Sequence, residues 1–230
     1  QTLQKNILKH SANLKDEFTF ISKSSVFYEP KDIVSGDFYA TFKAGDISYL
    51  IVADCTGHGV PGALMTIFSY SILKKVIEEE KIAGLTNILQ RVNELFLMNL
   101  KKKKEFLGND GMAISILSFN TVTKKIRITA VQQSLFFVSA MELKELKFKC
   151  SPINTVIDNY NYEEVELFPQ TGDRLIFYTD GIIDQKGGER KSRLMKSGFK
   201  EWIIKNNDAA TVNYQKKFDE CKGPNDQIDD

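Results

Sequence analysis

The hydrophobic residues in the first quarter of the chain fall into short runs that predict strands. Segments 18–28, 37–43 and 47–53 are rich in aromatic and β-branched residues, which favour extended structure. An Ala-Gly-Asp tripeptide at 44–46 joins the second and third runs, and its length and glycine content are typical of a hairpin. Pro30 ends the first run, because proline cannot donate a hydrogen bond to a sheet.

A different period predicts helices. Apolar side chains between 63 and 81 recur at positions 64, 67, 68, 72, 73, 76 and 77, which is the spacing of one helical face. Residues 85–100 predict a second helix, and residues 1–14 predict a leading amphipathic helix. Near the end of the chain, segments 199–205 and 211–221 also have a helical pattern.

Strand patterns dominate the region between these pairs of helices. The predicted strands are 113–120, 125–131, 135–139, 146–150, 163–167 and 173–179. Strands and helices therefore occur in blocks instead of alternating strictly, which favours an α+β fold with mainly antiparallel sheets. The chain shows no internal repeat and no Pro-, Gly- or Ser-rich linker, so we expect one folded domain.

The overall charge excludes partners that are held by bulk electrostatics. The 230 residues include 31 Lys and Arg and 30 Asp and Glu, which gives a net charge of +1. This balance argues against binding to nucleic acid or to an anionic membrane surface. A hydrophobic content of 42% with 27% charged residues is typical of a soluble globular domain.

The cysteines and the apolar runs bear on the cellular compartment. Cys55, Cys150 and Cys221 are odd in number and widely spaced, which fits neither a disulfide framework nor a Cys-x-x-Cys zinc site. The longest continuous apolar runs are well below the ~18 residues of a spanning helix, and the polar start has no signal-peptide pattern. We therefore expect a reducing, cytoplasmic location without membrane contact.

Four aspartates share an unusual sequence context. Asp37, Asp54, Asp180 and Asp229 each lie at the start or end of an apolar segment, next to a glycine or another carboxylate. A carboxylate at the mouth of a buried strand is costly unless it is paired or binds a cation. Magnesium and manganese prefer such oxygen ligands. For each aspartate taken alone, a helix cap or a turn is the favoured interpretation, and the metal-ligand interpretation stays open beside it.

Taken together, these residues lie in five motifs that occur in order along the chain. The motifs occupy residues 30–39, 52–65, 110–112, 177–185 and 227–230. The set resembles the SpoIIE/RsbU-type phosphatase domain of the metal-dependent, type 2C protein phosphatases, over about residues 8–230. This resemblance implies an α-β-β-α sandwich of two mainly antiparallel sheets flanked by helices. It also implies hydrolysis of phosphoserine or phosphothreonine on proteins.

The resemblance further implies a site with two Mn²⁺ or Mg²⁺ ions. Carried over by position, Asp54 would bridge the two ions, and the backbone carbonyl of Cys55 would be a further ligand of one of them. Asp37, Asp180 and Asp229 would be ligands of the other ion, and Asp54 and Asp180 would be the principal catalytic groups. Two such cations can activate a water and neutralise phosphoryl oxygens.

Other chemistry in the second motif is less favoured. Cys55 would act through its main chain and not as a reactive thiol. The glycines at 57, 59 and 62 nominally match a dinucleotide-binding loop, but no convincing βαβ context surrounds them. His58 could donate a proton to a leaving group, although its position relative to the family's motif favours a structural role.

Two departures from the family pattern leave a second hypothesis open. Many relatives carry an aspartate where this chain has Ala113, and relatives continue past Asp230 with a short apolar strand. The alternative to an active phosphatase is therefore a catalytically impaired binding or regulatory module. An aspartate phosphoacceptor of the receiver type is disfavoured, because neither a paired lysine nor a parallel βα alternation is apparent.

The resemblance also implies partners and a domain organisation. Such domains are usually the output end of bacterial signalling proteins, and their substrates are typically phosphorylated anti-sigma-factor antagonists. We expect residues 1–16 to be a leading linker or dimerisation helix, through which a homodimer could form. Residues 17–230 would then be the phosphatase domain, without its last strand.

Overall fold

The computed structural model describes residues 14–100, 111–140, 142–156, 160–187, 192–205 and 214–230. The predicted leading helix therefore lies outside the described residues, apart from Leu14 at the start of α2 (Leu14–Glu17).

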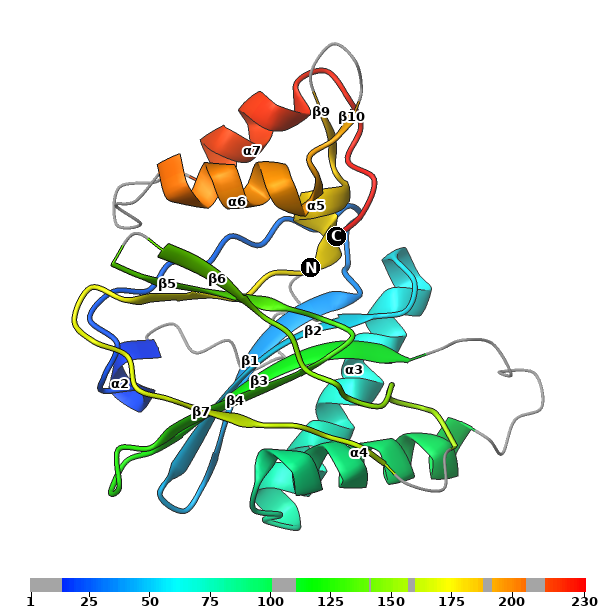
Figure 1. Ribbon diagram of the computed structural model, residues 1–230. Coiled ribbons are helices and arrows are strands. Elements are labelled where there is room, and N and C mark those ends of the chain that lie inside the picture. The colour runs from blue at the N-terminus through cyan, green and yellow to red at the C-terminus, as the bar shows by residue number, and fades with distance from the viewer. Residues whose placement is uncertain (1–13, 101–110, 141, 157–159, 188–191, 206–213) are drawn as a thin grey trace.

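Two antiparallel sheets form the centre of the domain (Figure 1). The larger sheet has the order β1-β2-β3-β4-β7 and the smaller one has the order β6-β5-β8. The strands of the larger sheet are β1 (Asp37–Ala44), β2 (Ile47–Cys55), β3 (Met112–Asn120), β4 (Ile126–Val131) and β7 (Val165–Leu167). Those of the smaller sheet are β5 (Leu135–Ser139), β6 (Glu142–Leu146) and β8 (Arg174–Ile176). A separate short ribbon consists of β9 (Lys186–Gly187) and β10 (Ser192–Arg193).

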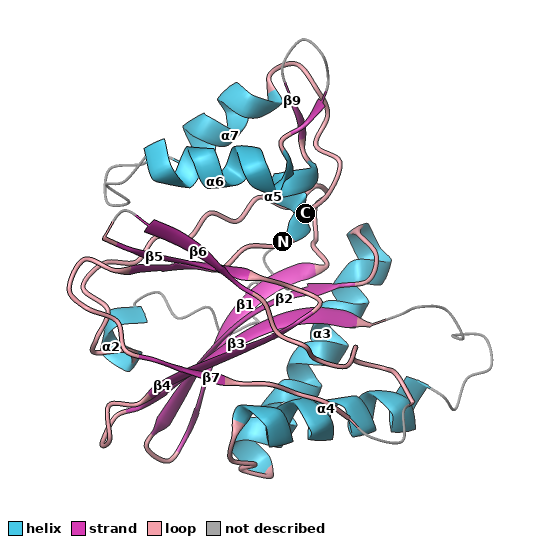
Figure 2. Ribbon diagram, viewed as in Figure 1, coloured by secondary structure: helices cyan, strands magenta, loops and turns pink. Residues whose placement is uncertain are grey.

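Helices cover the outer face of each sheet, as Figure 2 shows. The larger sheet carries α3 (Gly59–Lys74), its continuation η1 (Lys75–Glu79), which is one π-helical turn, and α4 (Leu85–Leu100). On the side of the smaller sheet lie α6 (Met195–Lys205) and α7 (Tyr214–Lys222), with the short α5 (Asp180–Asp184) beside them. The arrangement is an α-β-β-α sandwich, which confirms the predicted fold class.

Strict alternation along the strands separates two hydrophobic layers. In β1, Phe38, Ala40 and Phe42 face the helices and belong to a core with residues of α3 and α4. The opposite faces of the larger sheet contribute Leu50 and Leu117 to a second cluster, which the smaller sheet completes with Leu175. This period of two is the reason that any residue next to a core position in β1 or β2 points between the sheets.

A third cluster attaches α6 to the smaller sheet. Phe136 of β5 stacks on Tyr178, with ring centroids 4.9 Å apart. Phe199 of α6 meets the Tyr178 ring edge-on, and all three side chains are buried. Because Tyr178 precedes Asp180 by two residues, this aromatic packing also fixes the position of the segment that leads into α5.

Most sequence-predicted elements are confirmed. The predicted hairpin is β1–β2, with Gly45 in the left-handed region at φ +59°. The predicted helix 85–100 coincides with α4. The predicted helix 63–81 begins earlier, at Gly59, and its last turn is the π-helical η1.

Two predicted strands are wrong. Segment 18–28 forms no strand, because its aromatic side chains bridge separate elements: Phe20 packs on Phe119 and Phe27 packs on Phe218. The strand predicted at 146–150 lies instead at Glu142–Leu146, where it pairs with β5. Glu142, Lys144 and Glu145 make three of the five residues of this edge strand charged, so its hydrophobic signal is weak, which explains the shift.

One helical stretch is more apolar than the continuous runs in the sequence indicated. Among the described residues, the helix Gly59–Glu79 alone is long and apolar enough to cross a membrane. Half of that stretch is buried inside the fold, where it packs against the larger sheet. Burial in the domain core therefore accounts for its composition.

A partly buried ion-pair group attaches α6 to the edge of the smaller sheet. The Glu145 carboxylate of β6 accepts hydrogen bonds from Lys196 at 3.1 Å and Lys200 at 2.8 Å, and its side chain is only 12% exposed. Burial acts to raise the pKa of Glu145, but the hydrogen bonds from Lys200 and Lys196 outweigh it and hold this pKa at about 2. The pair therefore stabilises the fold above the ordinary pKa of a glutamate, and the contribution disappears as the pH falls towards 2.

We expect Glu145→Gln to lower the free energy of unfolding by about 1 kcal/mol at pH 7, because it removes the negative charge that two partly exposed lysines contact and water screens part of the loss. The difference between variant and parent should shrink as the pH falls from 4.5 to about 2. Urea unfolding at a series of pH values measures this. Glu142→Gln, on the same strand but exposed, is the matched control, and an equal loss in both variants would contradict the assignment.

Candidate active site

The register of the β1–β2 hairpin places two of the predicted site residues side by side. Asp37 and Asp54 are direct partners across the two strands. Their neighbours Phe38 and Ala53 face the helices, so both carboxylates project between the sheets. The hairpin therefore builds half of the acidic cluster from residues that are 17 positions apart in the sequence.

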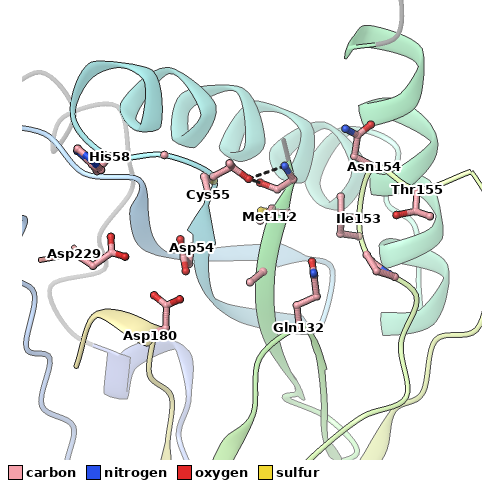
Figure 3. A pocket seen from close by; sticks show the side chains of 15 residues that line it. Asp54, Cys55, His58, Met112, Gln132, Ile153, Asn154, Thr155, Asp180 and Asp229 are labelled. Carbon is pink, nitrogen blue, oxygen red and sulfur yellow. Dashed lines mark hydrogen bonds between the residues drawn. The ribbon is translucent and has the colours of Figure 1, made fainter. Parts of the chain in front are cut away.

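The other two aspartates come from the C-terminal part of the chain. Asp180 is the first residue of α5, at the end of the short segment that follows β8 and contains Tyr178. Asp229 lies on the terminal segment. Figure 3 shows the side chains of Asp54, Asp180 and Asp229 turned towards the same space. The structure thus brings the four predicted acidic residues to one place.

This space is the mouth of a pocket of about 780 Å³. Asp37 is 8% exposed and lies behind Asp54, outside the pocket lining. The lining residues are Asp54, Cys55, Thr56, Gly57, His58, Gly111, Met112, Ala113, Gln132, Pro152, Ile153, Asn154, Thr155, Asp180 and Asp229. The pocket therefore has one acidic side and an otherwise uncharged surface, apart from His58 at the rim.

The four aspartates take part in no salt bridge within the described part of the chain. Burial, followed by the negative charges of Asp37 and Asp180, raises the pKa of Asp54 far above the usual range. Burial also raises the pKa of Asp37, against a hydrogen bond from Thr179 that lowers it. Such a like-charge group binds protons or cations.

The donor set suits a hard divalent cation, although the side chains do not form a closed cage. The Asp54 carboxyl is in hydrogen-bonding contact with Asp37 and with Asp180. Among the described residues, however, no three His, Cys, Asp or Glu side chains surround one point as metal ligands do. The arrangement supplies oxygen ligands of the type that Mg²⁺ and Mn²⁺ prefer, and small rotations of the carboxylates would be required to close around an ion.

Asp229 and Asp230 have different roles in the structure. The Asp230 carboxylate accepts hydrogen bonds from the backbone amides of Lys31 at 2.9 Å and Gly36 at 2.7 Å. Asp229 instead faces the pocket. Asp230 thus attaches the C-terminal segment to the loop before β1, a role that the sequence analysis missed. The hydrogen bond from Thr179 to Asp37 was also not predicted, because no pattern in the sequence indicates it.

Cys55 contributes its backbone to the pocket and not a reactive thiol. Its side chain is buried, with Sγ 3.3 Å from the Ser69 hydroxyl. Burial raises the pKa of this thiol to about 12, so it stays protonated and is a poor nucleophile. A side chain at Gly36 would come within 2.8 Å of the Cys55 carbonyl oxygen and closer still to that of Gly57. Only glycine allows the first two motifs to approach this closely.

His58 lies at the exposed rim of the pocket. Its Nδ1 is 3.2 Å from Asp32 Oδ2, and both side chains are about half exposed, at 56% and 48%. His58 is also the residue that precedes α3. The contact with Asp32 connects the first two motifs, which agrees with the structural role that the sequence favoured.

Ala113 occupies a position that matters for the site. It is the direct partner of Asp54 on the next strand, β3, and it lines the pocket. A longer side chain at this position would therefore point into the same space as Asp54. The absence of a carboxylate here leaves this side of the site apolar.

Solved structures with the same fold define the class of protein. The SiaA-PP2C domain of Pseudomonas aeruginosa is similar with a TM-score of 0.77 and 24% identity, covering 99% of this chain and 89% of that chain. The phosphatase domain of SpoIIE from Bacillus subtilis gives a TM-score of 0.64 and 14% identity, covering 86% of this chain and 57% of that one. The fold is therefore that of PP2C-type phosphatase domains.

The family follows from the sequence match. The family described as Stage II sporulation protein E (SpoIIE) matches residues 45–224, and the chain belongs to this family of protein phosphatases. The RsbU and RsbW domains of Rv1364c from Mycobacterium tuberculosis are also similar, with a TM-score of 0.61 and 18% identity over 81% of this chain. This chain spans only 49% of that protein and 57% of the SpoIIE chain. No curated protein sequence matches the chain.

We expect Asp54→Asn to raise the melting temperature at pH 7 in EDTA by roughly 2–8 °C. Because the pKa of Asp54 is raised, folding must either protonate this carboxyl or hold its charge beside the other carboxylates, and asparagine requires neither. Differential scanning calorimetry of the metal-free protein measures the effect. The control is Asp46→Asn in the exposed turn between β1 and β2, which should leave the melting temperature unchanged. A lower melting temperature for Asp54→Asn would contradict the repulsive cluster.

Proposed function

We propose that this domain hydrolyses phosphoserine or phosphothreonine on a protein substrate, using two divalent ions, Mn²⁺ or Mg²⁺. The observation that supports this proposal is the convergence of Asp54, Asp180 and Asp229 at the mouth of one pocket, with Asp37 paired to Asp54 across the hairpin. Among the described residues, no salt bridge involves any of the four. Membership of the SpoIIE family and the PP2C-type fold agree with it.

The residues would divide the work as follows. Asp54 would contact both ions, and the main-chain carbonyl of Cys55 would complete the coordination of one of them. Asp37, Asp180 and Asp229 would bind the other ion. When bound, such ions supply an activated water and neutralise charge on the phosphoryl group. No covalent nucleophile is required, which is consistent with the protonated thiol of Cys55.

The protein's own contribution is to hold these groups in place before substrate arrives. Thr179 fixes Asp37 by a hydrogen bond, and Asp230 fixes the loop that precedes it. A site positioned in this way avoids reorganisation during the reaction. Because the acidic cluster repels a phosphate monoester in the absence of metal, the residues would select phosphorylated substrates only together with their ions.

We further infer that the substrate is a phosphorylated protein of the anti-sigma-factor-antagonist type, in a cytoplasmic signalling pathway. The similarity to a protein with RsbU and RsbW domains and to the cell fate determinant SpoIIE supports this inference. Exposed apolar side chains in the first two motifs, Ile33, Val60 and Leu64, offer a contact surface for a protein. Residues 1–16 would connect this output domain to another part of a signalling protein or to a second copy.

We expect Asp180→Asn to reduce Mn²⁺-dependent hydrolysis of p-nitrophenyl phosphate by about two orders of magnitude or more, because it removes a metal ligand without creating a cavity. It should also abolish the increase in melting temperature that Mn²⁺ gives the parent. Asp184→Asn, at the other end of α5 in an exposed pair with Arg193, is the control and should retain both effects. Parent-like rates in Asp180→Asn would contradict the proposed ligand.

One observation favours the alternative of a catalytically impaired binding module. Ala113 lies directly opposite Asp54, at the position where many relatives have an additional aspartate. If that carboxylate were indispensable, the domain would bind phosphorylated protein without turnover.

We expect Ala113→Asp to increase Mn²⁺-dependent hydrolysis by about tenfold or more, because an added oxygen ligand strengthens metal binding. In EDTA the same variant should melt at a lower temperature than the parent, since it adds another charge to the cluster. Ala113→Asn has similar size without the charge and should show neither change. An inactive parent that gains turnover with Ala113→Asp would establish the binding-module alternative.

A further inference from the structure

The pocket continues well beyond the acidic cluster. Figure 3 shows Ile153, Asn154 and Thr155 on the side of the pocket opposite Asp229, with Gln132 between them and Asp180. Every lining residue on this side is uncharged. A pocket that served only the phosphoryl group would not need this second wall, so its chemistry indicates what else enters the site.

Two residues of this wall, Gln132 and Asn154, carry amide side chains on an unusual backbone conformation. Gln132 and Asn154 both lie in the left-handed region, at φ +57° and +67°, which is uncommon for residues other than glycine. Both residues line the pocket. A carboxamide offers a donor and an acceptor together, which matches the N–H and C=O of a peptide group. An uncharged wall of this kind suits polypeptide and not a second phosphate.

A buried asparagine on α4 holds the wall in place. Asn93 is fully buried on the apolar face of the helix. Its Oδ1 accepts hydrogen bonds from the backbone amides of Asn154 at 2.6 Å and Thr155 at 3.2 Å, and its Nδ2 donates to the Thr155 carbonyl at 3.1 Å.

The neighbouring Ile153 inserts its side chain into the core between the larger sheet and the helices. Segment 152–155 is thus fixed at two adjacent points, by a hydrogen-bonded amide and by an apolar side chain. A buried carboxamide is costly unless it is fully used. Here the Asn93 carboxamide fixes the conformation of the main chain at Asn154 and Thr155.

We propose that Gln132 and segment 152–155 form a substrate-recognition wall that binds the polypeptide next to the phosphorylated residue, and that Asn93 is its positioning residue. This inference rests on the proposed phosphatase function. The wall contacts main-chain groups, so it distinguishes phosphorylated protein from small phosphate esters and does not depend on one particular sequence.

The experiment compares two probes, phosphorylated casein and p-nitrophenyl phosphate, with Mn²⁺ present. Asn154→Gly and Gln132→Gly remove the amide side chains at positions whose φ glycine adopts freely. Each should lower the ratio of kcat/KM for casein to kcat/KM for p-nitrophenyl phosphate by about fivefold, the value of one hydrogen bond. The loss should appear in KM for casein and not in kcat.

Two further variants separate recognition from folding. Lys124→Gly has the same left-handed backbone, at φ +60°, but lies in the turn between β3 and β4, at the end of β3 remote from Met112. This control should keep the parent's ratio. Asn93→Ala should lower the ratio at least as much as Asn154→Gly. Asn93→Asp keeps the acceptor for both backbone amides and should recover part of the loss.

The possible failures are distinguishable. An unchanged ratio in both glycine variants, with a parent that hydrolyses both probes, would overturn the wall and leave the proposed function intact. A parent that hydrolyses neither probe would overturn the phosphatase function. The wall is then tested by binding of fluorescently labelled phosphocasein, for which the glycine variants should raise Kd about fivefold, and an unchanged Kd would overturn it.

Discussion

Repulsion among four carboxylates that share one site is the constraint that the rest of this structure must satisfy. Asp37 is buried and Asp180 is exposed, and gathering the four groups is costly because burial and their mutual charge both oppose ionisation. The fold gathers them by taking each from a separately anchored segment. The β1–β2 register positions Asp37 and Asp54, and α5 positions Asp180. The two backbone hydrogen bonds that the Asp230 carboxylate accepts hold the segment that carries Asp229. The stability of the surrounding layers offsets the cost of this arrangement.

The three hydrophobic layers have different relations to the site. The layer between the larger sheet and α3 and α4 supports the β1–β2 hairpin and also receives Ile153 from the pocket wall. The layer beneath α6 positions Tyr178, and with it the chain that leads to Asp180. The layer of α3 and α4 therefore supports both the hairpin aspartates and the uncharged wall, whereas Asp180 depends on the layer beneath α6.

The sequence predicted the parts of the molecule that repeat or that carry unusual chemistry. The extended runs at 37–43 and 47–53, joined by a short glycine-containing connection, predicted the hairpin, and the helical period predicted α4 with its bounds. The four aspartates were found because carboxylates beside apolar strands are conspicuous. The strand predicted at 18–28 failed because aromatic side chains that join distant elements look the same in a sequence as those of a strand. The pocket wall was missed because Asn93 meets segment 152–155 only through tertiary contacts.

The hairpin that carries Asp37 and Asp54 has a consequence for how this domain can diverge. Both aspartates stand at the open end of two strands of matched length, counted from the turn at Gly45. Inserting or deleting a single residue in either strand would turn one carboxylate towards the helices. Substitutions can accumulate in β1 and β2, but the number of residues in each strand must stay the same. Changes in length are therefore confined to connections outside this hairpin, such as the turn between β3 and β4, where no site residue depends on the count.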